Sequence, residues 1–378
     1  MKKKIAVIGS GIAGLTIANL FKENSNFQVK VYEREKTLSV EEGYGIQLAP
    51  NSISILNKIG FSKVDDKDFF NPSQLIFYSH DNQKICDLNL LSFNSDKYKY
   101  TTLKRSVLIE FLKNKLFEDN LKFGKEVKKI SKIKEKLLIN FKDNTNDLVD
   151  FVIVSDGVFS KTKSIIENKY ISPIYNGSIA IRTILKSTTE LKYDKNNISL
   201  VMLKNAHIVI YPINKKNELN LVCILRNKIS NDLNLIDIIK NKVLTQNKDL
   251  ENLFKGKLDY WPIYISKKPF KSNYENLFYL GDAFYTFPPT MAQGASQSIE
   301  AAFELFSLFS QQKKDIQNIY FKNRLQRTKL VNSRSKLNYH SFHLGNPTMI
   351  KVRNFILKKI SKSKKFQNRY FGNIYKKN

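Results

Sequence analysis

Three glycines near the start of the chain have the spacing of a dinucleotide-binding turn. The stretch Gly9-Ser10-Gly11-Ile12-Ala13-Gly14 follows a short apolar run and precedes a helical pattern. In such a G-x-G-x-x-G turn, the first glycine permits a tight bend, the second lets a pyrophosphate approach the backbone, and the third lets the helix pack on the strand. The free N–H groups of the first helical turn then face the phosphates. The stretch therefore predicts a bound nucleotide cofactor.

A carboxylate at the end of the next apolar run indicates which nucleotide is bound. Glu33 lies nineteen residues beyond Gly14 and ends the run 28–32. A carboxylate at this place accepts hydrogen bonds from ribose hydroxyls and repels a 2′-phosphate. The predicted nucleotide is therefore FAD or NAD and not NADP.

Three further stretches combine glycine with polar residues that suit cofactor binding. They are Gly43-Tyr44-Gly45-Ile46-Gln47-Leu48-Ala49-Pro50-Asn51, Asp156-Gly157-Val158-Phe159-Ser160, and Gly281-Asp282-Ala283 with Pro288-Pro289 and Met291-Ala292-Gln293-Gly294-Ala295 after it. Arg105 lies between the first and the second. Together with the N-terminal turn, these motifs extend in a fixed order over about 290 residues, which argues against coincidence.

In this order the motifs resemble those of the FAD-dependent aromatic hydroxylases, single-component flavoprotein monooxygenases such as salicylate, p-hydroxybenzoate and 6-hydroxynicotinate hydroxylases. The resemblance implies that the aspartate of the Gly281 motif holds the ribitol chain and that the following helix begins beside the flavin ring. The cofactor-binding residues that it implies are Gly9, Gly11, Ile12, Ala13, Gly14, Glu33, Arg34, Gly45, Arg105, Val127, Asp156, Gly157, Gly281, Asp282, Pro288, Gly294 and Ala295.

Three positions depart from the family pattern. Lys163 stands where the family usually has an arginine, so the charge is kept while the planar fork that would grip an NADPH phosphate is lost. Ala292 replaces the commonest glycine, and Ser296 stands in place of asparagine. These changes bear on the contacts expected around the flavin and the nicotinamide nucleotide.

Two strand-like motifs supply the candidate catalytic residues. The stretch 177–182 ends in Arg182 and resembles the family's G-x-x-A-x-R strand, while 207–212 resembles its H-x-x-x-Y-P. Residues two apart share one face of a strand, so His207 and Tyr211 are expected to point the same way. Either is a candidate to accept or relay a proton from a phenol, and Gln47 is a further pocket candidate. A histidine and a tyrosine with only structural hydrogen bonds remain an equal alternative.

The resemblance implies a flavin that does the difficult chemistry. NADH or NADPH would reduce FAD, O2 would add to the ring, and a flavin C4a-hydroperoxide would hydroxylate a small, aromatic substrate. The sequence contains no second G-x-G-x-x-G, so the nicotinamide nucleotide is expected to bind transiently. It also contains no H-E-x-x-H or cysteine-rich metal pattern, and no metal is predicted.

Two domains are expected to position these residues. The fold expected is α/β, with a Rossmann-like FAD-binding domain (1–75, 100–174 and 266–320), an inserted antiparallel-sheet substrate domain (76–99 and 175–265) and a basic C-terminal helical region (321–378). Strands are predicted at 5–8, 28–32, 151–154 and 277–280, and helices at 12–21, 51–59, 107–116 and 294–309. Asn51 and Ser106 are the expected N-caps of the second and third helices.

Composition adds bounds on location and partners. The 378 residues carry a formal net charge of +29, and the segment 316–378 contains sixteen Lys and Arg with no Asp or Glu. The two cysteines, Cys86 and Cys223, are far apart, which indicates a reducing cytoplasmic setting, and no stretch has the length of a membrane span. A small-molecule substrate and O2 are the expected partners, and no nucleic acid is expected. The sequence does not determine the oligomeric state.

Two rival functions stay open. One is a quinone-precursor hydroxylase with a lipid substrate, for which the basic C-terminus would make a weak peripheral membrane contact through apolar residues interleaved with arginine and lysines at 353–362. A solvated, packed helix pair is the preferred interpretation of that tail. The other rival is a non-catalytic flavin-binding protein. A flavin halogenase is disfavoured because the only tryptophan, Trp261, is not in a W-x-W-x-I-P motif.

Overall fold

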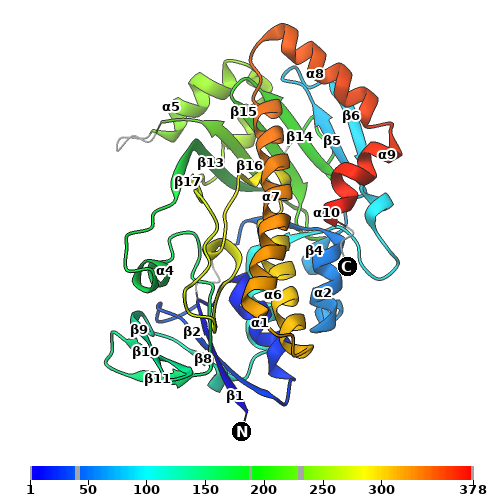
Figure 1. Cartoon of the computed structure of the whole chain (residues 1–378). Helices are drawn as coiled ribbons and strands as arrows, with labels where there is room; N and C mark the ends of the chain where they lie inside the picture. The colour runs from blue at the N-terminus through cyan, green and yellow to red at the C-terminus, as the bar shows by residue number, and fades with distance from the viewer. Residues whose placement is uncertain (1, 39–42, 187–189, 229–233, 376–378) are drawn as a thin grey trace.

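The computed structural model describes residues 2–38, 43–186, 190–228 and 234–375. Two sheets lie at opposite ends of an elongated molecule, and a long helix runs beside both (Figure 1). The first sheet contains the N-terminal strand, and the second contains most of the middle of the chain. The α/β class with a Rossmann-like domain and a separate, largely antiparallel sheet is confirmed.

The first sheet is parallel and has the strand order β18-β12-β1-β2-β8. Its strands are β1 (Lys3–Ile8), β2 (Phe27–Tyr32), β8 (Leu121–Lys122), β12 (Phe151–Val154) and β18 (Leu277–Tyr279). β1 and β12 are apolar where they pair, because both faces of the sheet are buried there. Helices cover one face, and residues 127–149 cover the other. Helices α1 (Ile12–Lys22) and α6 (Gly294–Ser310) pack against each other beside the sheet.

The second sheet has seven strands in the order β17-β13-β16-β15-β14-β5-β6. They are β5 (Gln74–Tyr78), β6 (Lys84–Asn89), β13 (Ile174–Lys186), β14 (Ile198–Leu203), β15 (Ala206–Pro212), β16 (Glu218–Arg226) and β17 (Asp259–Ile265). The pairing is antiparallel except between β5 and β14, which are parallel. Alternate residues of these strands form one apolar cluster on each face, and each cluster is covered by helices.

Two three-stranded sheets complete the strands. One contains β3 (Gly45–Leu48), β4 (Phe69–Phe70) and β7 (Thr101–Lys104), and the other contains β9 (Val127–Ile133), β10 (Lys136–Phe141) and β11 (Asn146–Val149). The first joins the two domains, because the Gly45 N–H donates to Asn220 Oδ1 at 2.7 Å and the Thr102 hydroxyl donates to the Pro212 carbonyl at 2.5 Å. Neither small sheet was expected from the sequence.

The predicted caps of two helices are wrong, although the helices are present. Helix α2 (Pro50–Lys58) begins after Ala49, and α3 (Arg105–Asn114) begins after Lys104. Asn51 instead donates its side-chain amide to Glu300 Oε2 at 3.0 Å, since proline at the first helical position already sets the entry into α2. Two short helices, α4 (Lys161–Ile166) and α5 (Leu235–Ile239), follow later in the chain.

The last part of the chain is helical. It contains α7 (Ile316–Phe342), α8 (Pro347–Ile360), α9 (Lys364–Gln367) and α10 (Asn373–Tyr375), while 376–378 of the predicted basic region lie outside the described residues. The boundary expected between 320 and 321 falls inside α7, which runs from the parallel sheet to the far end of the larger sheet (Figure 1). Within the described ranges, no helix is both long enough and apolar enough to cross a bilayer.

Candidate functional site

The N-terminal glycine turn has the close contacts that its sequence predicts. Gly9 has φ +99°, and a Cβ there would lie 2.8 Å from the backbone of Asp156. A Cβ at Gly14 would lie 2.0 Å from the Gly9 carbonyl oxygen and 2.6 Å from Ser155 Oγ. At Gly11, by contrast, a Cβ would meet no protein atom within 4 Å. The first and third glycines are therefore required by packing, and the second leaves open space before α1.

Glu33 is held against this turn by hydrogen bonds. Its Oε2 accepts from the Ser10 N–H at 2.9 Å and from the Ser10 hydroxyl at 2.7 Å, and its Oε1 accepts from the Glu35 N–H at 3.1 Å. Partial burial acts to raise the pKa of Glu33, but these hydrogen bonds outweigh it and lower the pKa. The carboxylate is therefore ionised beside the turn, while the neighbouring Arg34 is exposed and paired with Glu35 at 3.1 Å.

The Gly281 segment lies in contact with the N-terminal turn. Gly281 has φ +61°, and a Cβ there would lie 2.9 Å from the Ala13 side chain of α1 and 3.0 Å from Ser298 Oγ of α6. The next residue is Asp282. Desolvation by the surrounding protein raises the pKa of its carboxyl to about 6. The positive charges of Arg105 and Lys163 act in the opposite direction. Segments some 270 residues apart thus form one site.

Asp156 lies against the Gly9 turn and Arg105 lies near Asp282, while two predicted cofactor residues are exceptions. Asp156 directly follows β12, next to β1, and accepts a hydrogen bond from the Thr162 N–H at 3.2 Å through Oδ2. Arg105 opens α3, where its N–H donates to the Tyr44 carbonyl at 2.9 Å. The two exceptions are Arg34, which points to solvent, and Val127, whose side chain is packed in an apolar cluster with Tyr32 and so leaves only its backbone for a ligand.

The site meets the requirements of an extended dinucleotide such as the implied FAD. Asp156 Oδ1 is buried with no hydrogen-bond partner within the described part of the chain, which is costly unless a ligand supplies a donor. Gly11, Gly157 and Gly294 all face space free of protein within 4 Å of a Cβ. These positions lie at the starts of helices and in loops at the carboxyl ends of β1 and β12, where open α/β sheets bind ligands.

A cavity of about 680 Å³ opens beside this site. One end, called the polar end below, is bounded by Gly45, Gln47, Gly294 and Ala295, which belong to β3 and to the start of α6. Its walls come from the larger sheet and from the C-terminal helices, and they are mostly apolar. Pro288, the remaining predicted cofactor residue, is buried in the loop just before α6.

All four predicted catalytic residues line this cavity. Burial raises the pKa of Tyr211, while the charge of Arg182 and contacts with Gln47 and Asn220 act to lower it. The Tyr211 hydroxyl therefore stays protonated near neutral pH and is a hydrogen-bond donor. Arg182 stacks on Trp261 with 5.8 Å between the guanidinium carbon and the ring centroid, and its buried Nε has no hydrogen-bond partner in the described residues.

His207 is poorly suited to act as a base. Its Nδ1 lies 2.7 Å from His343 Nε2, where α7 ends, and its ring also contacts Phe342. Burial lowers the pKa of His207 to about 3, so the imidazole is neutral and accepts a proton weakly. Among the described groups that face His207, none is a carboxylate that would raise this pKa. The contact with His343 instead fastens the end of α7 to the sheet.

The three positions that depart from the family pattern have clear roles. Lys163 is buried and donates to the Ala283 carbonyl at 2.9 Å, so it supports the Gly281 loop. Ala292 adopts φ +50°, a conformation that favours glycine. Ser296 is buried against α2, accepting from the Ala49 N–H at 3.2 Å and lying 3.0 Å from Ser52 Oγ.

Sequence reasoning missed several residues of the cavity. The Tyr100 hydroxyl donates to Gln47 Oε1 at 2.8 Å, and the ring of Tyr100 contacts Tyr375 of α10 with 5.6 Å between centroids. Asn220 supports both Gly45 and Tyr211. No local motif marks these residues. They come from a strand edge, a hairpin and the C-terminal segment, which only the folded chain brings together.

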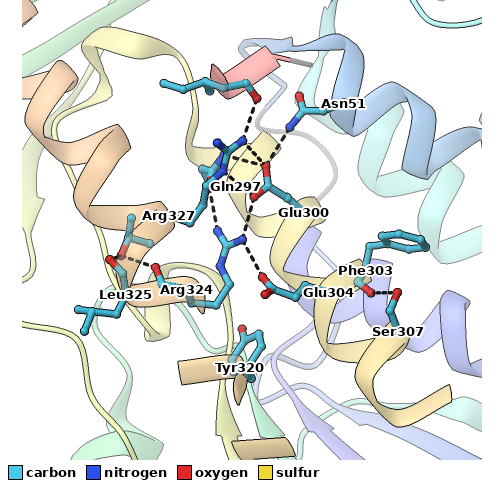
Figure 2. A network of polar contacts seen from close by, with 12 residues as sticks. Asn51, Gln297, Glu300, Phe303, Glu304, Ser307, Tyr320, Arg324, Leu325 and Arg327 are labelled. Atoms are coloured by element: carbon cyan, nitrogen blue, oxygen red, sulfur yellow. Dashed lines mark hydrogen bonds and ion pairs between the residues drawn. The ribbon is translucent and has the colours of Figure 1, made fainter. Parts of the chain in front are cut away.

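A buried ionic cluster holds α6 in place (Figure 2). Glu300 of α6 accepts from Arg324 Nη1 at 2.9 Å and from Arg327 Nε and Nη2 at 2.7 Å each. Asn51 reaches the same carboxylate from α2, and Arg327 also donates to the carbonyls of Asn373 and Ile374. The cluster therefore connects α2, α6, α7 and α10, and it fixes the helix whose first residues border the cavity.

Within the described ranges, no group of three or more His, Cys, Asp or Glu side chains is placed to hold a metal ion. The two cysteines are free thiols, Cys223 buried and Cys86 at the cavity wall.

Comparison with known proteins gives consistent results. The sequence profile of the FAD binding domain family matches residues 2–329. The chain is 24% identical to 6-hydroxynicotinate 3-monooxygenase of Bordetella bronchiseptica over 82% of this chain and 83% of that protein. It is 22% identical to a 3-amino-4-hydroxybenzoate 2-monooxygenase of Streptomyces platensis over 91% and 89% of the two chains. The crystal structure of Klebsiella pneumoniae HpxO complexed with FAD and uric acid has a TM-score of 0.80 at 17% identity, covering 99% of this chain and 96% of that one.

Proposed function

Because the chain belongs to the FAD binding domain family and is an FAD-dependent monooxygenase, we propose that it hydroxylates a phenolic or otherwise oxygenated aromatic ring in the 680 Å³ cavity. NADH or NADPH is the proposed reductant. The balanced reaction is Ar–H + O2 + NAD(P)H + H⁺ → Ar–OH + NAD(P)⁺ + H2O. One oxygen atom enters the ring, the other leaves as water, and the nicotinamide supplies two electrons.

The observation that carries this proposal is the position of the cavity. Its polar end adjoins Gly45, Gly294 and Ala295, and FAD when bound there supplies the redox chemistry that activates O2. A dry cavity of about 150 Å³ is enough for benzene, so an aromatic ring fits with much room to spare. The apolar walls exclude water from the reacting atoms, which limits the unproductive loss of reducing equivalents.

The polar groups at that end suit an electron-rich, partly anionic ring. Arg182 offers positive charge and a buried Nε without a partner among the described residues, so a phenolate or ring carboxylate satisfies both needs. The protonated Tyr211 hydroxyl donates to the same oxygen, and Gln47, oriented by Tyr100, fixes the ring's angle. Holding the phenolate form enriches the ring for electrophilic attack.

Replacing Tyr211 with phenylalanine tests this assignment. We expect Tyr211→Phe to lower kcat/KM for a phenolic substrate about ten- to hundredfold, since a hydrogen bond to a charged oxygen contributes ~1.5–3 kcal/mol. FAD content and the slow NAD(P)H oxidation without substrate are expected to stay unchanged. Tyr193→Phe is the matched control: Tyr193 is also buried and hydrogen-bonded through its hydroxyl, but it belongs to the cluster on the opposite face of the sheet. Equal losses in the two variants would remove Tyr211 from the site.

The function itself is tested with the purified protein. We expect a yellow protein that oxidises NADH or NADPH under O2 and does so faster when salicylate, 6-hydroxynicotinate or 4-hydroxybenzoate is added. Mass spectrometry of the product after reaction under ¹⁸O2 measures incorporation of one oxygen atom. A flavin-loaded protein that stays inert to both nucleotides with every aromatic would favour the non-catalytic alternative.

A further inference from the structure

The cavity continues from its polar end to the outer surface of the C-terminal helices. Met349, Val352 and Ile356 of α8 line it, and the same three side chains are 46% to 50% exposed. Leu337 of α7 also lines the cavity and is 59% exposed. A residue that both lines a cavity and contacts solvent marks its mouth. The mouth of this cavity therefore lies between α7 and α8, and it is rimmed by apolar side chains.

The edge of α8 between the cavity mouth and solvent is apolar and half exposed. Met349, Val352 and Ile356 recur at intervals of three and four residues and so share one side of the helix, with Phe355, 62% exposed, beside them. Arg353 and Leu357 lie on the neighbouring side of the helix, which packs inward toward β6 and also lines the cavity. Figure 1 shows α8 along the outer edge of the molecule, at the end away from the parallel sheet.

Basic residues border this apolar face. Lys351, Lys358, Lys359 and Lys362 are exposed on α8 and just after it, and Lys359 Nζ lies 5.6 Å from the Phe355 ring centroid. No aspartate or glutamate occurs from residue 316 onward. On the adjoining β6, the carboxylate of Asp87 is already paired with Lys84 at 2.6 Å. An apolar face with a cationic margin matches the interface of an anionic bilayer, where apolar side chains enter the acyl region and lysines meet phosphates.

The size and lining of the cavity indicate which substrate would enter from such a membrane surface. Between the polar end and the mouth, the walls are side chains such as Phe77, Leu88, Leu200 and Phe342. The volume of about 680 Å³, part of which a bound flavin would take at the polar end, is more than four times the ~150 Å³ that suffices for one benzene ring. A single small aromatic acid would leave most of this apolar space without contacts, whereas an attached hydrocarbon chain would fill it.

We propose that α8 docks on anionic phospholipid membranes and that the substrate is an aromatic ring carrying an apolar chain, which enters from the membrane between α7 and α8. This inference rests on the proposed function and adds the substrate class and the partner surface. The ring lies at Arg182, Tyr211 and Gln47, and the chain extends past Leu200 and Phe342 toward Val352 and Ile356.

The test uses the full-length, FAD-loaded protein with two measurements. The first is sedimentation with vesicles of phosphatidylcholine alone or with phosphatidylglycerol at one third of the lipid. The second is NAD(P)H-dependent hydroxylation of a homologous series, phenol and 4-alkylphenols from methyl to nonyl. Phe355→Asp removes an exposed apolar side chain that does not line the cavity, and Ile236→Asp makes the same change at an exposed position of α5 as the control.

We expect wild-type protein to sediment with the anionic vesicles and to be released by high salt. Phe355→Asp should weaken that binding about ten- to hundredfold, and Ile236→Asp should not change it. Hydroxylation of phenol in solution should be equal in all three proteins. KM should fall about two- to fourfold for each added methylene until the cavity is full.

Several results would overturn the inference. Wild-type protein that hydroxylates the short phenols but stays in solution with anionic vesicles, or whose KM is independent of chain length, excludes it while leaving the proposed function intact. A concentration-dependent dimer that Phe355→Asp converts to a monomer, without vesicle binding, would assign the α8 face to a second copy of the chain. Absence of hydroxylation across the whole series would contradict the proposed function and this inference together.

Discussion

Gly14→Ala is expected to abolish FAD binding at cellular concentrations. The added methyl group would lie 2.0 Å from the Gly9 carbonyl oxygen and 2.6 Å from Ser155 Oγ, and the first of these is a backbone atom that can move only with the turn itself. Overpacking of this kind costs ~1–3 kcal/mol in stability, and displacement of the turn removes the N–H groups that face the phosphates. We expect FAD affinity to fall at least about a hundredfold, or ~3 kcal/mol. Flavin absorbance per protein and titration of the flavin-free protein with FAD measure it.

Gly11→Ala is the matched control, because the same methyl group meets no protein atom within 4 Å and the backbone there is extended. We expect the flavin-free form of this variant to unfold at the same temperature as wild type, while FAD binds more weakly because the methyl group occupies the approach of the pyrophosphate. If Gly14→Ala retained its flavin, or if Gly11→Ala bound FAD as tightly as wild type, the turn would not be the pyrophosphate site.

Glu300→Ala is expected to cost about 3–5 kcal/mol of stability, the range found when one partner is removed from a buried ion pair. Arg324 and Arg327 would keep buried positive charges without the carboxylate that both of them contact. Because the cluster also holds the backbone near Ile374, the variant should lose both the C-terminal wall of the cavity and the position of α6. Urea unfolding followed by far-ultraviolet circular dichroism and by flavin release measures the two effects.

The control for this variant is Glu304→Ala. Glu304 lies one helical turn further on, is more exposed, and contacts Arg324 at 3.2 Å, so its loss should cost about 1 kcal/mol or less. Similar losses for the two variants would show that helix composition, and not the buried cluster, governs the effect.

The same carboxylate predicts how stability depends on pH. Burial acts to raise the pKa of Glu300, but the charges and hydrogen bonds of Arg324 and Arg327 overcome it and lower the pKa to about 2. A group whose pKa is lowered on folding stabilises the native state above its unfolded pKa, so this contribution of ~3 kcal/mol is complete above about pH 5 and is lost as pH falls toward 2. Glu300→Gln should flatten the acid side of the profile of melting temperature against pH.

The sequence was most informative where local chemistry determines structure. The glycine turn, the apolar run of β1 and the start of α6 at Gly294 all follow from patterns within a few residues. Pairing partners did not follow, because strands choose neighbours by burial and shape that emerge only when distant segments meet. The parallel contact between β5 and β14 and the two small sheets are examples. The N-cap predictions were wrong for a related reason. The Asn51 side chain donates to Glu300 and does not cap its own helix.

Motif spacing predicted residues at the polar end of the cavity but none at its mouth. Gln47, Arg182 and Tyr211 were identified through stretches that resemble a known pattern, and they line one cavity in the folded chain. The mouth between α7 and α8 depends on which side of α8 faces outward, and the interleaved lysines did not decide this. The role of His207 also required the structure, because only folding places His343 2.7 Å from its ring and removes both from water.

The order of strands in the two main sheets has a consequence during synthesis. β1 pairs with β12, some 146 residues later, and β12 then pairs with β18 beyond residue 276, while β17 completes the edge of the larger sheet. β1 can pair with β2 early, but at ~5–20 residues per second the edge of β1 that binds β12 waits on the order of 10 s for that partner. During that interval this edge exposes unpaired backbone groups, which chaperones recognise and through which chains aggregate when chaperones are scarce.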